Sequence, residues 1–271
     1  MKAFARVNTL IMIVMAVGAS VLMPACSGSD SKLQDYINRA NDECPISFET
    51  GTLTSLTSEG GAVVFNYQTD ENVIPFAKLK DNTDVVKQLW KIAFLDDKSG
   101  NKGEFVSNVI SSGCDVVLKY TGNDPQQKFE VKFSNVELKA LVGKNSNLAE
   151  LIEIQIKLTN LTLPRQLDKA TTMVETKLED GFMVYAYEID ESQLTIAKME
   201  SEKLTYHDNI LASVKREFAN PASAVSAFFK QVASSGRGLR YSYRGNTSGS
   251  TLNIDIPNTE LRQLAMDIPA R

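Results

Sequence analysis

The side chains best suited to binding a ligand lie in one short segment near the C-terminus. Residues 237–244 carry Arg237, Arg240, Tyr241, Tyr243 and Arg244. If this segment is a strand, Arg240 and Arg244 share one face and the two tyrosines share the other. A basic face on a chain with a net charge of −4 would suit an anionic ligand or an acidic partner. The alternative is an ordinary solvated sheet face, because arginine is usually exposed.

The sequence lacks the residue sets that most catalytic sites need. His207 is the only histidine, whereas a catalytic triad or a metal site needs further partners. One histidine and three cysteines are too few for a dedicated Cys/His zinc site. Gly-x-Ser-x-Gly, Gly-x-Gly-x-x-Gly and phosphate-binding loops are missing. We therefore expect no enzyme activity, no metal and no other cofactor.

Two pairs of adjacent carboxylates, Asp70-Glu71 and Asp190-Glu191, could serve acid-base chemistry or calcium binding. Neighbouring residues on an extended chain point to opposite faces, so each pair would not converge on one site. We interpret them as turn residues that follow a strand.

The first 26 residues resemble a bacterial lipoprotein signal. Lys2 and Arg6 precede an apolar run over residues 10–23, no acidic residue appears before Asp30, and Ala25-Cys26 closes the segment. The resemblance implies removal of residues 1–25 and attachment of a diacylglycerol to the Cys26 sulfur. Residues 26–32 would form a lipidated tether. The alternatives are an ordinary cleaved signal or an uncleaved anchor, with Cys26 an incidental thiol.

The rest of the chain repeats one pattern at an offset of 119 to 123 residues. Five short motifs recur in the same order: the prolines at 45 and 164, the aromatic strands at 65–67 and 185–187, the acidic pairs, the Ser-Ser-Gly motifs at 111–113 and 234–236, and residues 133–138 against 256–261. Several ordered matches favour tandem duplication over chance similarity. We expect repeat units over residues 33–147 and 148–271.

Each repeat has the same predicted elements. In the first, strands are expected at residues 51–57 and 62–68, helices at 83–95 and 103–112, and strands at 115–120 and 128–133. In the second, strands are expected at 171–178 and 182–189, helices at 203–218 and 221–235, and strands at 238–243 and 251–256. Gly-containing turns at 59–61 and 179–181 favour hairpins. The predicted fold is α+β: two tandem β-β-α-α-β-β repeats, each a four-stranded antiparallel sheet with helices on one face.

This arrangement resembles a tandem of small bacterial envelope domains of uncharacterised function. The matching residues are Asn41, Cys44, Pro45, Tyr67, Gly113, Tyr120, Asn160, Pro164, Tyr187, Gly236 and Tyr243. The resemblance implies a place in the cell envelope but no activity.

Cys44 and Cys114 could form a disulfide in the first repeat, which an envelope compartment permits. Their counterparts in the second repeat are Leu163 and Arg237, so both thiols are absent there together. The alternative is two separate buried thiols.

Three classes of function remain open. The net charge argues against a nucleic-acid binder, which normally shows a basic surface. We expect a non-catalytic binding or assembly lipoprotein, anchored to a membrane, facing the periplasm and contacting an envelope protein or polymer. One alternative is a small-ligand or saccharide binder that uses the Tyr/Arg segment at 237–244. The other is a hydrolase, which needs two carboxylates facing one cleft.

Overall fold

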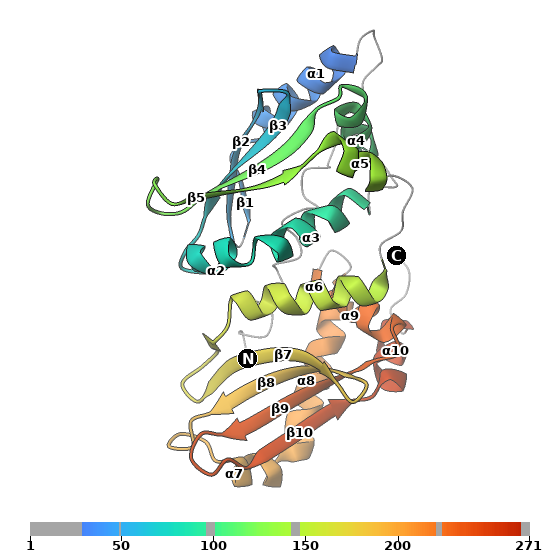
Figure 1. The fold of residues 1–271 in the computed structure, drawn as a ribbon. Helices are drawn as coiled ribbons and strands as arrows, with labels where there is room; N and C mark the ends of the chain where they lie inside the picture. Colours follow the sequence, from blue (N-terminus) through green and yellow to red (C-terminus); the bar gives the residue numbers. More distant parts are fainter. Residues whose placement is uncertain (1–28, 49, 96–100, 142–146, 221–223, 267–271) are drawn as a thin grey trace. The chain divides into compact units, whose positions relative to one another are not determined.

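The computed structural model describes residues 29–48, 50–95, 101–141, 147–220 and 224–266 (Figure 1). The chain divides into two compact units, with the boundary between Asn147 and Leu148. We call the described residues before this boundary the N-terminal unit and those after it the C-terminal unit. Both units combine helices with a five-stranded sheet.

The N-terminal unit contains, in chain order, α1 (Ser29–Asp42), β1 (Ile46–Phe48), β2 (Gly51–Glu59), β3 (Ala62–Thr69), α2 (Phe76–Asp81), α3 (Thr83–Leu95), α4 (Asn101–Ser111), β4 (Asp115–Thr121), β5 (Lys128–Phe133) and α5 (Asn135–Leu141). The C-terminal unit contains α6 (Leu148–Leu161), β6 (Arg165–Gln166), β7 (Thr171–Glu179), β8 (Phe182–Ile189), α7 (Ile196–Ser201), α8 (Lys203–Phe218), α9 (Ala224–Ser234), β9 (Gly238–Gly245), β10 (Thr251–Ile256) and α10 (Asn258–Met266).

The prediction of four-stranded antiparallel sheets is wrong, because each sheet has five strands and one parallel pair. The strand order is β1-β2-β3-β4-β5 in one unit and β6-β7-β8-β9-β10 in the other. The central pairs β3–β4 and β8–β9 are parallel, and the other neighbours are antiparallel. The sheets are mixed because the helices between the central strands form a crossover that returns the chain to the end where the previous strand began. The extra strands β1 and β6 were missed because they are only three and two residues long.

The longer elements lie where the sequence predicts them, and several short helices were not anticipated. Helices α3 and α8 and strands β5, β8 and β10 have the predicted bounds. Helices α2, α5, α7 and α10 were missed. Helix α1 begins at Ser29, so residues 29–32 of the predicted tether are helical. Cys26 and Pro221 lie outside the described residues.

The predicted hairpin turns are present in both units. Gly60 and Gly61 have φ angles of 57° and 80°, and Asp180 and Gly181 have 50° and 80°. Two successive residues with positive φ are typical of the tight turn that matches the twist of a two-stranded hairpin.

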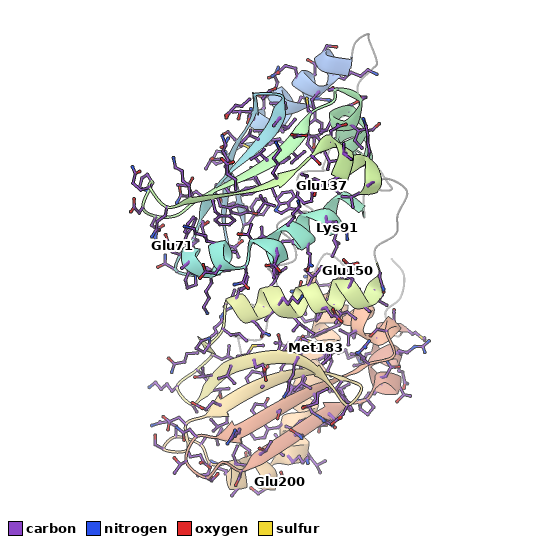
Figure 2. The ribbon with its side chains drawn as sticks, viewed as in Figure 1. Glu71, Lys91, Glu137, Glu150, Met183 and Glu200 are labelled. Carbon is purple, nitrogen blue, oxygen red and sulfur yellow. The ribbon has the colours of Figure 1, made fainter. Side chains whose placement is uncertain are left out.

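Helices cover one face of the sheet in the C-terminal unit. Alternate residues of β8, including Met183 (Figure 2), join one hydrophobic core with residues from α6, α8, α9 and α10. The opposite face carries polar residues such as Asn253 and Asp255 of β10. The same alternation appears in β5, where Phe129, Val131 and Phe133 are buried and the intervening Glu130 and Lys132 are exposed.

One asparagine in each unit ties a helix to the sheet. The Asn41 side chain donates to the Leu56 carbonyl at 2.5 Å and accepts from the Leu56 N–H at 2.6 Å. Asn160 makes the same two bonds to Thr176, at 2.9 and 2.8 Å. These bonds satisfy backbone groups just after a β-bulge that both sheets share. Asn41 and Asn160 are therefore structural residues.

Candidate functional site: a pocket in the C-terminal unit

The arginines of the predicted ligand face do not form a free basic surface. Arg240 donates two hydrogen bonds to Asp255, at 2.8 and 2.9 Å, and lies 3.7 Å from a carboxylate oxygen of Asp180. Its guanidinium also lies 4.4 Å from the ring centroid of Phe182. The bond to Asp255 raises the pKa of Arg240, so the arginine charge is fixed and compensated. Arg240 is paired in this way because the neighbouring strand β10 places the carboxylate of Asp255 directly opposite it.

The other two arginines are apart from this ion pair. Arg244 is exposed at the end of β9, and Arg237 precedes the strand and is half-buried. The three arginines of residues 237–244 therefore do not form one basic site.

The tyrosines lie on the opposite, helix-covered face of the same strand. Tyr241 and Tyr243 are 3% and 5% exposed. Tyr241 stacks on Tyr185 with ring centroids 5.5 Å apart, and Tyr243 stacks on Tyr187 at 5.0 Å. Burial raises the pKa of both phenols well above the ordinary value. They remain protonated at neutral pH and can donate a hydrogen bond.

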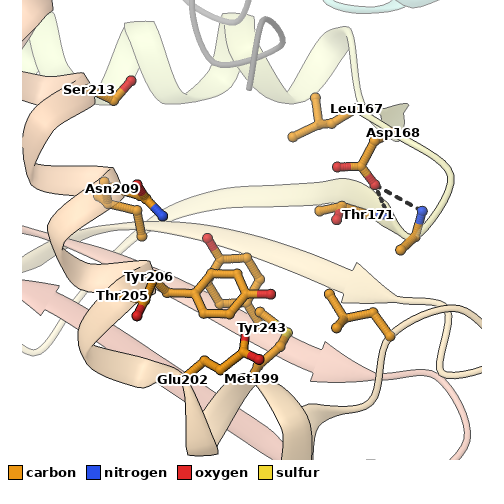
Figure 3. Close-up of a pocket in the computed structure, with 13 residues that line it drawn as sticks. Leu167, Asp168, Thr171, Met199, Glu202, Thr205, Tyr206, Asn209, Ser213 and Tyr243 are labelled. Carbon is orange, nitrogen blue, oxygen red and sulfur yellow. Dashed lines mark hydrogen bonds between the residues drawn. The ribbon is translucent and has the colours of Figure 1, made fainter.

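A pocket of about 360 Å³ opens over Tyr243 (Figure 3). Its walls come from the loop between β6 and β7, from α7 and its preceding loop, and from α8. The lining residues are Leu167, Asp168, Ala170, Thr171, Leu194, Met199, Glu202, Thr205, Tyr206, Asn209, Ile210, Ser213 and Tyr243. A cavity of this size is in the range that holds a small organic ligand.

Helical spacing brings three polar side chains of α8 to the pocket. Tyr206, Asn209 and Ser213 recur at intervals of three and four residues, so they share one face of the helix. Figure 3 shows the Tyr206 and Tyr243 rings in the middle of the pocket, with Asn209 on the α8 side. The same helix also contributes Ile210, Val214 and Phe218 to the hydrophobic core.

The loop before β7 holds Asp168 on the other side of the pocket. One carboxylate oxygen of Asp168 accepts hydrogen bonds from the backbone N–H groups of Ala170 and Thr171, at 2.9 and 2.8 Å. These bonds, dashed in Figure 3, fix the loop as an Asx-type turn. The second oxygen accepts no hydrogen bond from another described residue.

The pocket is acidic and aromatic. Burial raises the pKa of Tyr206, and the charges of Glu202 and Asp168 raise it further. Burial raises the pKa of Tyr243 in the same way, with added contributions from Tyr206 and Asp168. Glu202 and Asp168 are therefore close enough to affect the ionisation of Tyr206, and Asp168 is close enough to affect that of Tyr243. Within the described part of the chain, no lysine, arginine or histidine lines the pocket.

Comparison of the two units explains why the pocket exists. Tyr120 stacks on Tyr67 in the N-terminal unit as Tyr243 stacks on Tyr187. There the Trp90 indole N–H donates to the Tyr120 hydroxyl at 2.9 Å, and Trp90 is buried. At the offset of 120 residues that relates α3 to α8, the residue in place of Trp90 is Ile210. The smaller side chain leaves the space above the tyrosine open.

The Tyr243 hydroxyl consequently faces the pocket without a partner. Tyr243 makes no hydrogen bond with any other residue in the described ranges, although the residue is only 5% exposed. A tyrosine hydroxyl that opens on a pocket can donate to and accept from water or a ligand there. The Tyr243 hydroxyl is therefore the polar group around which a ligand would bind.

The predicted disulfide is not formed, and Cys44 and Cys114 are both half-buried thiols. Cys44 leads into β1 and Cys114 leads into β4, with β2 and β3 between them. Three strand spacings are about 14 Å, whereas a disulfide needs Cα atoms within about 7 Å. Burial, followed by the charge of Glu43, raises the pKa of Cys44, so this cysteine is a weak nucleophile at neutral pH.

The repeated carboxylates have structural roles. Asp70 and Asp190 each accept the backbone N–H two residues later. Glu71 accepts from the Asn123 N–H at 2.5 Å, and Glu191 accepts from the N–H of Ser248 at 2.5 Å. Each glutamate thus ties the loop after a central strand to the neighbouring hairpin. The turn interpretation is confirmed.

His207 lies near the surface beside two carboxylates, 3.4 Å from Asp208 and 3.9 Å from Glu260. Within the described ranges, no group of three or more His, Cys, Asp or Glu residues could hold a metal ion. The same part of the chain contains no helix with the length and apolar character that a membrane crossing requires.

Comparison with known proteins does not identify a family. No family model and no curated protein matches the chain. Among solved structures, the crystal structure of a protein described as secreted, from Pseudomonas aeruginosa, is similar, with a TM-score of 0.31 and 13% sequence identity. The similarity covers 42% of this chain and 99% of that protein. Similarity at this level carries no argument about function.

Tyr243 is the pocket-lining residue that the pattern of residues 237–244 also indicated, and the rest of the pocket was missed. Asp168, Glu202 and Tyr206 come from elements far from β9 in sequence, and only the fold brings them together. One signal was present: Ile210 stands where the first repeat has Trp90. A large core residue replaced by a small one at a matched position can indicate a cavity.

Proposed function

We propose that this chain is a non-catalytic binding lipoprotein of the bacterial cell envelope, and that the pocket over Tyr243 binds a small molecule. The observation that carries the proposal is the unpartnered Tyr243 hydroxyl at the base of a cavity of about 360 Å³. Leu167, Leu194 and Met199 would contact the apolar part of a ligand. The polar residues around them would fix its orientation.

Binding is favoured over hydrolysis by the surroundings of the two carboxylates. A carboxylate-dependent hydrolase needs an acid and a base or nucleophile that face one bond. Asp168 is held by the backbone of its own loop, and Glu202 precedes α8 without capping it. Among the residues that the structure describes, neither carboxylate is hydrogen-bonded to another side chain. We therefore assign both to ligand recognition.

The binding proposal is tested with fragments and the substitution Ile210→Trp. We expect some fragments of about ten non-hydrogen atoms to bind the full chain in detergent with millimolar affinity. Ile210→Trp should fill the pocket as Trp90 does in the N-terminal unit, and should weaken binding about tenfold or more. Equilibrium dialysis measures the affinity.

Leu204→Trp is the control, because Leu204 is 80% exposed and does not line the pocket. Fragments that bind equally well to the Ile210→Trp protein would overturn the proposal.

The anchoring proposal is supported by the basic start, the apolar run and Cys26 in the first 26 residues. Several acyl chains bind a membrane firmly, because each buried CH₂ contributes about 0.8 kcal/mol. Cys26→Ala should therefore abolish acylation and the acyl-dependent association with membranes. Mass spectrometry of the N-terminal peptide and fractionation of the envelope check this. A Cys26→Ala protein that is still acylated would contradict it.

A further inference from the structure

We infer that the pocket over Tyr243 selects a small organic amine, in its protonated form, attached to an apolar or aromatic body. This inference rests on the proposed binding function and names the class of ligand. It reverses the expectation from the arginines of residues 237–244, which pointed to an anion.

The charges of the pocket have one sign. Asp168 and Glu202 are the carboxylates among its described lining residues, and none of these described residues is basic. Lys169, Lys198 and Lys203 are near these residues in sequence, but none of them lines the pocket. A cation entering the pocket would therefore meet two carboxylates, whereas an anion would meet repulsion without a counter-charge.

The pocket also supplies aromatic faces. Tyr206 and Tyr243 lie in the middle of the pocket (Figure 3), and both residues line it. Ammonium groups are attracted to aromatic faces as well as to carboxylates, and the attraction is strongest where water is excluded. Tyr243 is only 5% exposed and stacks on Tyr187, so the half-buried Tyr206 supplies most of the accessible aromatic surface.

Apolar side chains line the rest of the cavity. Leu167, Leu194, Met199 and Ile210 offer a surface that a fully polar cation such as ammonium or a metal ion would leave uncovered. The combination of carboxylates, aromatic rings and aliphatic side chains is complementary to a molecule with one cationic end and one apolar end. The cavity volume of about 360 Å³ admits such a molecule in full.

The test uses three probes with the same aromatic body and different charge: phenethylamine, phenethyl alcohol and phenylacetate. We expect phenethylamine to bind the full chain about tenfold more tightly than the alcohol, with phenylacetate weakest. Isothermal titration or ligand-detected NMR measures the three affinities at neutral pH. Ile210→Trp should abolish binding of all three probes.

Glu202→Gln isolates the contribution of charge. Glu202 makes no capping bond to α8, so the amide should leave the fold intact while removing most of the preference for the amine. Glu200→Gln is the matched control, because Glu200 lies on α7 (Figure 2), is exposed and does not line the pocket. The control should keep the full preference.

The outcomes separate this inference from the proposed function. If the alcohol or phenylacetate binds as tightly as the amine and Ile210→Trp removes that binding, the pocket binds ligands but the amine inference is overturned. If Ile210→Trp leaves binding of the amine unchanged, the probe binds elsewhere and both are overturned. If Glu200→Gln and Glu202→Gln lower the preference equally, the effect is one of net charge and the inference is overturned.

Discussion

Above about pH 10 the protein should lose stability steeply, because buried tyrosines must ionise when it unfolds. Burial raises the pKa of Tyr67, Tyr120, Tyr187, Tyr241 and Tyr243. In the unfolded chain these phenols titrate near pH 10. The folded state therefore holds more protons than the unfolded state at higher pH. The stabilisation is fully present below about pH 10 and is lost progressively as the pH rises toward the folded-state pKa values.

The expected magnitude is large. Each tyrosine that stays protonated in the folded state costs about 1.4 kcal/mol of stability at pH 11 relative to neutral pH. The three tyrosines of the C-terminal unit then account for about 4 kcal/mol and the two of the N-terminal unit for about 3 kcal/mol. Since domains are stable by about 5–15 kcal/mol in total, one or both units should approach unfolding at this pH.

Urea unfolding at about pH 8 and about pH 11 measures this loss. Trp90 is the only tryptophan, so its fluorescence reports on the N-terminal unit, while circular dichroism reports on both. Tyr187→Phe serves as a control that should reduce the pH dependence of the C-terminal unit by about one third. Equal stability at the two pH values, or tyrosinate absorbance at full intensity in the folded protein, would show that these phenols are not buried.

Exchanging the residues at positions 90 and 210 should lower stability by very different amounts in the two units. Trp90→Ile removes a buried indole that packs on Phe65 and Tyr67 and leaves the Tyr120 hydroxyl without its donor. We expect a loss of about 3 kcal/mol from the cavity and the lost hydrogen bond together. Ile210→Trp extends into space that is already open, so its cost should be within about 1 kcal/mol, well below that of overpacking a filled core.

Chemical denaturation followed by circular dichroism measures both substitutions on one scale. Tyr120→Phe separates the two causes, since it removes the hydrogen bond but keeps the ring, and it should cost only about 1 kcal/mol. Equal costs for Trp90→Ile and Ile210→Trp would mean that position 210 is as tightly packed as position 90. The proposed origin of the pocket would then be wrong.

The sequence predicted the fold where periodicity is long and clean. Strand β5 alternates apolar and charged residues over its full length, and α8 carries apolar residues at helical spacing, so both were placed correctly. The parallel pairing of β3 with β4 was not predicted, because pairing direction depends on where the crossover returns the chain and not on the pattern within either strand. Short elements such as β6 have too few residues to show any period.

The candidate site was harder to predict for a related reason. Alternation within β9 correctly separates Tyr243 from Arg240, but it cannot show which face has a cavity. That depends on Ile210 of α8 and on the loop at Asp168, which lie far from β9 in sequence and meet it only in the folded unit. Likewise, the compensation of Arg240 depends on the register of β10, which places Asp255 opposite.

The central claim is that the C-terminal unit has an open binding pocket at a position that Trp90 closes in the N-terminal unit. The most direct measurement follows Tyr243 and Tyr120 together, by NMR of the full chain with isotope-labelled tyrosine rings, during titration with phenethylamine. We expect the Tyr243 signal to shift with saturation while the Tyr120 signal stays in place, and we expect neither to shift in the Ile210→Trp protein. Equal shifts of the two tyrosines, or a Tyr243 shift that persists after Ile210→Trp, would contradict the account.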